Sequence, residues 1–323
     1  MKLVIAPDSF KEAASAARVA AAVADGWRSV WPETELCLVP MADGGEGTLD
    51  ALVGGGRGRV ERVETTGPLG EPVTASLGFL DEGRAAVVES AQAVGLSLIP
   101  PERRNPALTT TFGVGRMIAA GLDRGARRIL VAVGGTSTND GGAGMAQALG
   151  VSLKDAEGRE LRPGGEALLR LDRVDSSGLD PRIAKTEILV ACDVNNPLCG
   201  PAGASLLYSP QKGADPEMAE LLDDALAHFA GVVMRDLDRD ARLLPGGGAA
   251  GGLGAGLAAF LGARLVPGVE VVAREAGLEA ALRGADLVIT GEGRLDAQSL
   301  WGEGRVGGSR LARAAGVPVI ALA

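Results

Sequence analysis

Apolar runs alternate with helical stretches at both ends of the chain. Each run is followed by a polar turn and then by residues whose apolar positions recur with helical spacing. Strands that alternate with helices in this way are typical of a parallel sheet covered by helices. The pattern predicts strands at 2–6, 35–41, 285–290 and 317–323, and helices at 15–30 and 46–53.

The middle of the chain has a different pattern. Three short alternating segments joined by tight turns, at 60–64, 72–80 and 84–89, predict an antiparallel portion. Helical spacing then returns, and the expected elements are helices at 110–124, 143–149, 216–237 and 269–282 and strands at 128–133 and 186–191. We therefore predict an α/β protein of two domains. A parallel-sheet domain comprises residues 1–66 and 285–323, and a mixed α/β domain, 67–284, is inserted into it.

The last expected strand, 317–323, is apolar throughout. Such a strand is normally buried on both faces of a parallel sheet, and no helix follows it here. We therefore expect the first domain to be incomplete at its C-terminal side.

Composition narrows the function classes. The 323 residues are 46% hydrophobic and include 49 glycines, as expected for a globular protein with many tight turns between strands and helices. A net charge of -9 without a dense basic run argues against nucleic acid or anionic membrane as a partner. No apolar run is long enough for a membrane span, and the N-terminal run is too short for a signal peptide, so we expect a cytoplasmic protein.

Cysteine and histidine are scarce. Three cysteines and one histidine, His228, argue against a disulfide framework and a structural zinc site. Catalytic mechanisms that pair serine or cysteine with histidine are nearly excluded for the same reason. Carboxylates must therefore carry out any proton transfer.

A loop rich in glycine and hydroxyl groups, residues 134–142, follows the expected strand 128–133. Its glycine amides can approach an anion closely, its hydroxyls can bind that anion, and Asp140 can hold a metal or orient a substrate hydroxyl. The pattern predicts a site for a small, oxygen-rich anion. The alternative is that Asp140 only caps the helix 143–149. The candidate binding residues are Gly135, Ser137, Thr138, Asn139 and Asp140.

Charged and amide side chains follow four other expected strands. Phosphoryl transfer requires a cation beside the phosphate oxygens and carboxylates for a divalent metal, and these loops supply both. Helix caps, an Asx turn before Pro197 and surface ion pairs are the structural alternatives. The residues concerned are Ser9 and Lys11 after the first strand, Asp43, Gly44 and Gly45 after the second, Asp193 and Asn195 after 186–191, and Glu292, Arg294 and Asp296 after 285–290.

Two further segments have ambiguous patterns. Lys212 can contact a phosphate, or it can be an exposed lysine in a turn. The glycine run 246–254 enters a helix whose N-terminus can receive phosphate, but it matches no established nucleotide-binding fingerprint.

Several long motifs, taken in order, closely resemble the bacterial glycerate kinase family, type I. They are residues 4–12, 40–48, 134–142, 191–193, 210–214 and 289–296, and the resemblance extends from Lys2 to about Trp301. It implies ATP and Mg²⁺, D-glycerate as acceptor, usually 2-phosphoglycerate as product, and two α/β domains of which the one built from both chain ends is flavodoxin-like. Two departures are evident: Glu303 stands where the family commonly has a lysine, and the family continues beyond Ala323.

We therefore expect an ATP-dependent kinase that converts D-glycerate to 2-phosphoglycerate as a monomer or homodimer, with no nucleic acid or membrane partner. Asp193 is the expected base for the acceptor hydroxyl, Lys11 and Lys212 stabilise transferred charge, and Asp43 organises metal or phosphate. Glu292 and Asp296 are the expected metal ligands. Ser9, Gly44, Gly45, Gly135, Ser137, Thr138, Asn139, Asp140, Asn195 and Arg294 are expected to bind substrate or phosphate.

Two other functions remain open at this point. The same carboxylates suit a metal-dependent phosphatase acting on small phosphoesters. A metabolite-binding relative that has lost turnover is the other alternative. ATP consumption that requires glycerate would separate both from a kinase.

Overall fold

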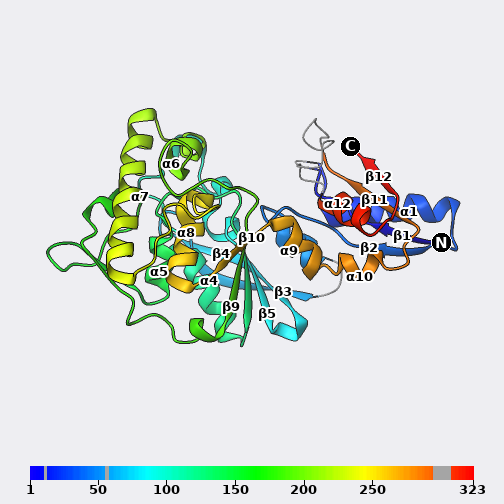
Figure 1. Ribbon diagram of the computed structural model, residues 1–323, viewed down its shortest axis with the longest axis horizontal. Coiled ribbons are helices and arrows are strands. Elements are labelled where there is room, and N and C mark those ends of the chain that lie inside the picture. The colour runs from blue at the N-terminus through cyan, green and yellow to red at the C-terminus, as the bar shows by residue number, and fades with distance from the viewer. Residues whose placement is uncertain (11–12, 55–57, 294–306) are drawn as a thin grey trace. The chain divides into compact units, whose positions relative to one another are not determined.

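The chain folds into two compact α/β units (Figure 1). The computed structural model describes residues 1–10, 13–54, 58–293 and 307–323. We call residues 1–59 with 266–323 the terminal unit, and residues 60–265 the inserted unit. The predicted α/β fold class is confirmed.

The terminal unit is built on a four-stranded sheet in the order β12-β11-β1-β2. All three neighbouring pairs are parallel, and Leu3 of β1 lies opposite Leu287 of β11. The prediction that both chain ends join one parallel sheet is therefore confirmed. The strands are β1 (Lys2–Ile5), β2 (Glu35–Leu38), β11 (Leu287–Gly291) and β12 (Val319–Leu322).

Helices of the terminal unit cover this sheet. In α1 (Ala16–Val30), Ala20 and Ala24 pack against Leu3 and Ile5, and the Ser15 side chain caps the helix by accepting from the backbone N–H of Arg18. The other helices are α2 (Thr48–Val53), α9 (Gly268–Glu275), α10 (Leu278–Leu282) and α12 (Gly307–Ala314).

Three details of the terminal unit differ from expectation. The helix expected at 269–282 is two helices, because Gly277 takes a left-handed conformation between them, with φ of 71°. Both helices contact α12, so residues 266–284 group with the terminal unit rather than with the inserted one. Strand β12 is the edge strand of the sheet and Ile320 is 46% exposed, so burial on both faces is not seen in the described residues.

The inserted unit contains a six-stranded mixed sheet in the order β10-β9-β6-β5-β4-β3. Strands β4 and β5 are antiparallel, as the alternating pattern predicted, whereas β6 runs parallel to both β5 and β9. The strands are β3 (Gly58–Thr66), β4 (Pro72–Leu80), β5 (Ala85–Glu89), β6 (Arg128–Ala132), β9 (Glu187–Ala191) and β10 (Arg264–Val266).

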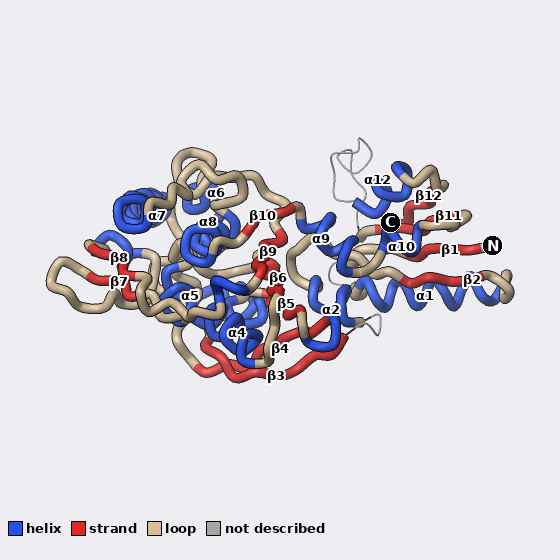
Figure 2. Tube along the Cα trace, turned by 60° about the horizontal axis from the view of Figure 1, so that its bottom comes forward, coloured by secondary structure: helices blue, strands red, loops and turns tan. Residues whose placement is uncertain are grey.

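Helices lie in layers on this mixed sheet. Helices α4, α5 and α8 lie along one side of it, and the long helix α7 lies farther out (Figures 1 and 2). Their interface is a continuous apolar core that includes Met117, Val131 and Phe229. The helices are α3 (Ala91–Val94), α4 (Phe112–Asp123), α5 (Ala143–Ala148), α6 (Ala204–Tyr208), α7 (Pro216–Leu237) and α8 (Ala249–Leu261), and a small antiparallel pair is formed by β7 (Ser152–Lys154) and β8 (Arg173–Asp175).

Among the described residues, no helix is both long enough and apolar enough to cross a bilayer.

Candidate functional site

The glycine- and hydroxyl-rich loop 134–142 leaves the end of β6 and turns into the interior. Gly135 is exposed with φ of 69°, a conformation that suits glycine, whereas Ser137, Thr138 and Asn139 are each at most 2% exposed. The Ser137 hydroxyl and backbone N–H both donate to the carbonyl of Val94, at 3.0 and 2.9 Å. The loop therefore presents backbone at Gly135, while the side chains that follow are enclosed.

Asp140 lies at the centre of this enclosed loop. Its carboxylate accepts from the backbone N–H and hydroxyl of Thr111 at 2.7 and 2.9 Å, and from the backbone N–H groups of Gly142 and Gly144 at 3.1 and 3.2 Å. Burial raises the pKa of Asp140 although these donors oppose the shift. This geometry is that of the capping alternative, because the carboxylate fastens the loop to the first turn of α5.

Lys212 is buried against the same loop. Its side chain is 3% exposed, and its Nζ donates to the carbonyl oxygen of Thr138 at 2.7 Å. Burial lowers the pKa of Lys212 to about 8, and the charge of Asp140 opposes that shift. The exposed-turn alternative for Lys212 is therefore wrong, and the ammonium group acts on the backbone of the loop.

Several hydroxyl and amide oxygens of the loop 134–142 and of the turn before Lys212 are buried without a hydrogen-bond partner among the described residues. Asn139 uses its amide nitrogen to donate to Ser205 at 2.9 Å, but its Oδ1 has no such partner. Because buried polar atoms are nearly always hydrogen-bonded in native proteins, a cluster of this kind marks a candidate ligand site. The unpartnered atoms are Thr136 Oγ1, Thr138 Oγ1, Asn139 Oδ1 and Ser209 Oγ.

Two of these residues, Thr136 and Ser209, were not among the predicted site residues. Thr136 lies within the loop 134–142, so the predicted site residues on either side of it were the available signal. Ser209 begins the turn that contains Lys212, so its place beside that candidate in the chain was the available signal, and its carbonyl accepts from the backbone N–H of Lys212 at 2.9 Å.

Asp193 lies at the same edge of the mixed sheet as the loop 134–142. Strands β6 and β9 are parallel, and Ala132 is in register with Ala191, so the residues after each strand emerge side by side. Asp193 and Asn195 are both exposed. Asn196, in contrast, donates to the carbonyl of Ala202 at 2.9 Å and has a structural role.

The terminal unit brings a second set of predicted residues together at the ends of β1, β2 and β11. The backbone N–H of Asp8 donates to Gly291 at 2.8 Å, and the Asp43 carboxylate accepts from the N–H of Gly45 at 2.9 Å. Burial raises the pKa of Asp8 to about 6, and the charges of Asp43 and Glu292 contribute to the increase. Ser9 and Gly44 adjoin these carboxylates in the chain. Asp8 lies in the segment 4–12 that carries the family resemblance but was not among the predicted site residues.

The carboxylates of Asp8, Asp43 and Glu292 are the described candidates for holding Mg²⁺ in the terminal unit. No three histidine, cysteine or acidic side chains within the described ranges are placed to hold one ion. Mg²⁺ usually takes one or two carboxylates together with substrate phosphates and water, so one or two of Asp8, Asp43 and Glu292 suit it as donors. Lys11, Arg294, Asp296 and Glu303 lie outside the described residues.

Comparison with known proteins gives one family over nearly the whole chain. The model of the glycerate kinase family matches residues 3–323. The glycerate kinase of Bacillus subtilis (strain 168) and the glycerate 2-kinase of Escherichia coli (strain K12) are each 48% identical over 323 residues, which are 100% of this chain and 85% of the relative. A crystal structure assigned to glycerate kinase 2 of Salmonella typhimurium LT2 superposes with a TM-score of 0.94 at 50% identity, covering 99% of this chain and 86% of that one. The chain therefore belongs to the glycerate kinase family.

Proposed function

We propose that this protein transfers the γ-phosphoryl group of ATP to the 2-hydroxyl of D-glycerate. The observation that carries this proposal is the family match over residues 3–323, together with relatives of known name that are 48% identical over the full chain. The relative named glycerate 2-kinase supports the 2-hydroxyl as the acceptor atom. Family membership does not favour the phosphatase or the binding protein without turnover.

Asp193 is the proposed base. It is an exposed carboxylate at the end of β9, so its oxygens can reach a substrate hydroxyl and accept its proton. His228 is unsuited to that role. Its Nε2 lies 2.7 Å from the carbonyl oxygen of Leu171, so this nitrogen is occupied by a backbone group outside the loops of the site. Asn195, also exposed, is the proposed neighbour that hydrogen-bonds substrate.

The loop 134–142 is the proposed anion-binding element of the inserted unit. Gly135 offers exposed backbone, and Thr138 and Asn139 carry buried oxygens that have no hydrogen-bond partner within the described ranges. Lys212 supports this loop through the Thr138 carbonyl, so we assign it a positioning role in place of direct contact with transferred charge.

The carboxylates of the terminal unit are the proposed metal ligands. One or two of the carboxylates of Asp8, Asp43 and Glu292 would hold Mg²⁺ together with the substrate phosphates, and the ion would neutralise charge on the β- and γ-phosphates. In the absence of a cation, burial and like charge keep Asp8 partly protonated near pH 6. Lys11, Arg294 and Asp296 stay predicted members of the site, as do cytoplasmic location and a monomeric or homodimeric state.

The test is a coupled ADP-release assay with D-glycerate, L-glycerate and no acceptor, each with Mg²⁺ and with EDTA. We expect ADP release that requires both D-glycerate and Mg²⁺, and a ³¹P NMR spectrum that identifies 2-phosphoglycerate as product. Hydrolysis of small phosphoesters without ATP would instead indicate the phosphatase. Glycerate binding without ADP release would indicate the metabolite-binding protein.

A further inference from the structure

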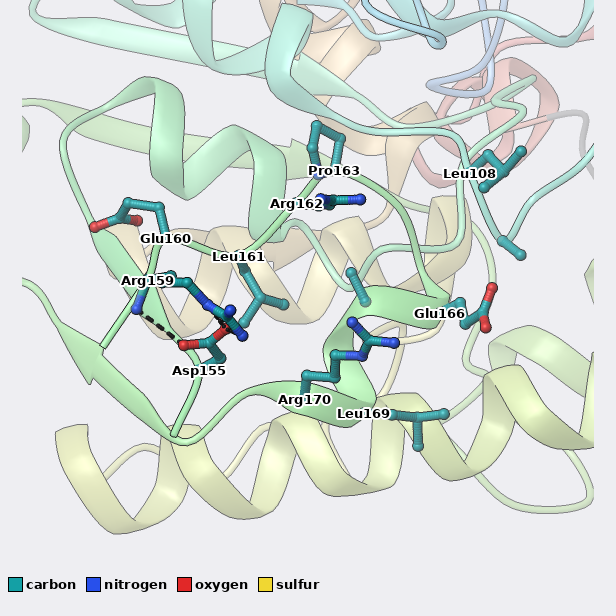
Figure 3. A pocket seen from close by; sticks show the side chains of 12 residues that line it. Leu108, Asp155, Arg159, Glu160, Leu161, Arg162, Pro163, Glu166, Leu169 and Arg170 are labelled. Atoms are coloured by element: carbon teal, nitrogen blue, oxygen red, sulfur yellow. Dashed lines mark hydrogen bonds and ion pairs between the residues drawn. The ribbon is translucent and has the colours of Figure 1, made fainter. Parts of the chain in front are cut away.

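The inserted unit has a pocket of about 590 Å³ that none of the proposed roles uses (Figure 3). It lies within the segment that connects β7 to β8, and residues of the 107–108 segment form one side of it. We call it the arginine pocket and define it by Leu108, Arg159, Arg162, Glu166, Leu169 and Arg170.

The frame of the arginine pocket is fixed to the core. The backbone N–H of Leu161 donates to Leu153 at 2.7 Å, and that of Glu166 donates to Ala107 at 3.2 Å. Leu168 and Leu171 on the same segment are at most 2% exposed. The pocket is therefore part of a packed structure, and its volume falls in the range of small-molecule sites.

Some charged groups of the pocket have internal partners. Arg159 pairs with Asp155 at 2.8 Å and with Glu157 at 2.7 Å. Glu160 accepts from the hydroxyl of Ser152 and from a backbone N–H. Arg159 is therefore occupied by two carboxylates and is not free for an anionic ligand, and with Glu160 this part of the lining carries more negative than positive charge.

Arg162 and Arg170 differ from Arg159 because neither has an ion pair within the part of the chain that the structure describes. Both are exposed, and so is Glu166, which likewise has no ion pair there. Figure 3 shows Arg170 directed toward the open space that Arg162 and Leu108 border on the other side. The pocket therefore combines two free guanidinium groups, one free carboxylate and the side chains of Leu108 and Leu169, which are 54% and 41% exposed.

This combination selects one class of ligand. Two free guanidinium groups match a phosphate monoester, which carries close to two negative charges at neutral pH and accepts paired N–H bonds from arginine. The Glu166 carboxylate repels a bare phosphate but accepts hydrogen bonds from hydroxyl groups. Exposed leucines give an apolar surface for a flat ring.

We propose that the arginine pocket binds a nucleoside monophosphate. Its phosphate lies at Arg162 and Arg170, its ribose hydroxyls donate to Glu166, and its base packs against Leu108 and Leu169. This site is additional to the phosphoryl-transfer site proposed above.

The segment that forms one side of the arginine pocket continues into Thr109. The Thr109 hydroxyl donates to the carbonyl of Ser137 at 3.0 Å, so the pocket adjoins the loop 134–142.

The test is isothermal titration of the full chain with AMP at fixed ionic strength. Arg162→Ala and Arg170→Ala are compared with the parent and with Arg116→Ala, which removes an exposed arginine of α4 outside the pocket. We expect AMP affinity to fall by about 10-fold or more in each pocket variant, because a hydrogen bond to a charged group is removed, and to stay unchanged in the control. Arg170→Lys should lose part of the affinity, because lysine keeps the charge but not the paired geometry.

Kinetics separates this pocket from the site for ATP. We expect the KM for ATP in both alanine variants to stay within about 2-fold of the parent value, with thermal unfolding showing that each is folded. No AMP binding to the parent, or equal binding in all variants, overturns the proposal. A KM for ATP raised about 10-fold or more in both variants also overturns it, because the pocket would then serve the phosphoryl donor. Calorimetry needs no acceptor, so a failure of glycerate phosphorylation would be seen separately.

Discussion

At the scale of single residues, burial determines which charged groups can meet a substrate. Asp140 and Lys212 are enclosed and bind backbone groups of the loop 134–142, whereas Asp193 remains exposed at the end of its strand. The first two therefore act through the shape of the loop. Of these three residues, Asp193 is the one that we propose for direct proton transfer.

Replacing Asp193 by Asn tests its role as the base. We expect turnover to fall by at least ~10²-fold, because general base catalysis is lost while the amide keeps the shape of the side chain. Glycerate binding, measured by calorimetry, should persist. Asp224→Asn, which changes an exposed carboxylate of α7, is the control and should keep normal turnover. Near-normal turnover in Asp193→Asn would remove this residue from the mechanism.

Replacing Asp8 by Asn should lower activity and raise stability. The folded protein holds the Asp8 proton up to about pH 6, whereas the ordinary pKa is 3.8, so the stability that Asp8 contributes is lost as pH rises from 3.8 to 6. At pH 7 the free energy of unfolding should therefore increase by up to ~3 kcal/mol in the variant. Urea unfolding and ADP release measure the two effects, with Asp25→Asn on α1 as control. A variant that is both less stable and fully active would contradict the proposed site.

Lys212 should give the protein a distinctive pH dependence. The pKa of Lys212 is about 8 in the folded state, whereas its ordinary value is 10.5. Between these two pH values the unfolded chain binds the proton and the folded protein does not, so the free energy of unfolding rises with pH. From pH 7.5 to 10.5, the free energy of unfolding of the parent should rise by up to ~3 kcal/mol more than that of Lys212→Met. Denaturant titrations at these pH values measure it. Parallel pH profiles would show that Lys212 titrates normally.

At the scale of elements, the glycine-rich start of α8 is shaped by its contact with the candidate loop. Gly251 has φ of 69°, and a Cβ atom there would lie 2.0 Å from the carbonyl oxygen of Thr138. Gly252 is also left-handed, at 89°. The absence of side chains therefore lets α8 approach the loop 134–142 closely.

Alanine at Gly251 should destabilise the protein by at least ~2 kcal/mol, because the left-handed conformation and the contact with Thr138 both disfavour a Cβ. Gly231→Ala is a matched control. Gly231 is exposed in the middle of α7, and a Cβ atom there would meet nothing within 4 Å. That change should stabilise the protein by about 0.5–1 kcal/mol, since alanine favours helix. Urea unfolding of both variants measures these changes. Equal changes in the free energy of unfolding would mean that the close contact at Gly251 is not needed for stability.

The sequence predicted elements best where burial imposes a simple period. The strand 187–191 and the helix 216–237 match their predicted positions to within one residue, because the strand is apolar after Glu187 and the helix keeps an apolar face over many turns. The burial of Lys212 was not predictable in this way. Its environment comes from residues far away in the chain, such as Thr138, which a local pattern does not reveal.

At the scale of the whole molecule, the terminal unit depends on pairing between the two ends of the chain, while the inserted unit is continuous. The shared strand-helix pattern of the ends allowed this pairing to be predicted. The position of residues 266–284 was not predictable, because helical periodicity shows that a helix has an apolar face but not which sheet it covers.

The inserted unit should fold without the rest of the chain. Residues 58–266 retain all of β3 to β10 and the core cluster from Val63 to Ala263. We expect this fragment to unfold cooperatively in urea, because its apolar core lies entirely within it. A fragment of residues 1–59 should remain unfolded, since β1 then lacks β11. Gradual, non-cooperative unfolding of the longer fragment would show that it needs the chain ends.

The pairing of β1 with β11 also affects how the protein is made. Strands β1 and β2 leave the ribosome early, but their partner β11 begins only at Leu287. At about 5–20 residues per second, the roughly 250 residues that separate β2 from β11 take ~12–50 s to synthesise. Throughout that interval the nascent N-terminal segment carries an apolar strand with an unsatisfied edge, while the inserted unit can already form. The first strand to be translated can therefore pair with β2 early but completes its place in the sheet only after β11 has been made, and until then its other edge can pair with another chain.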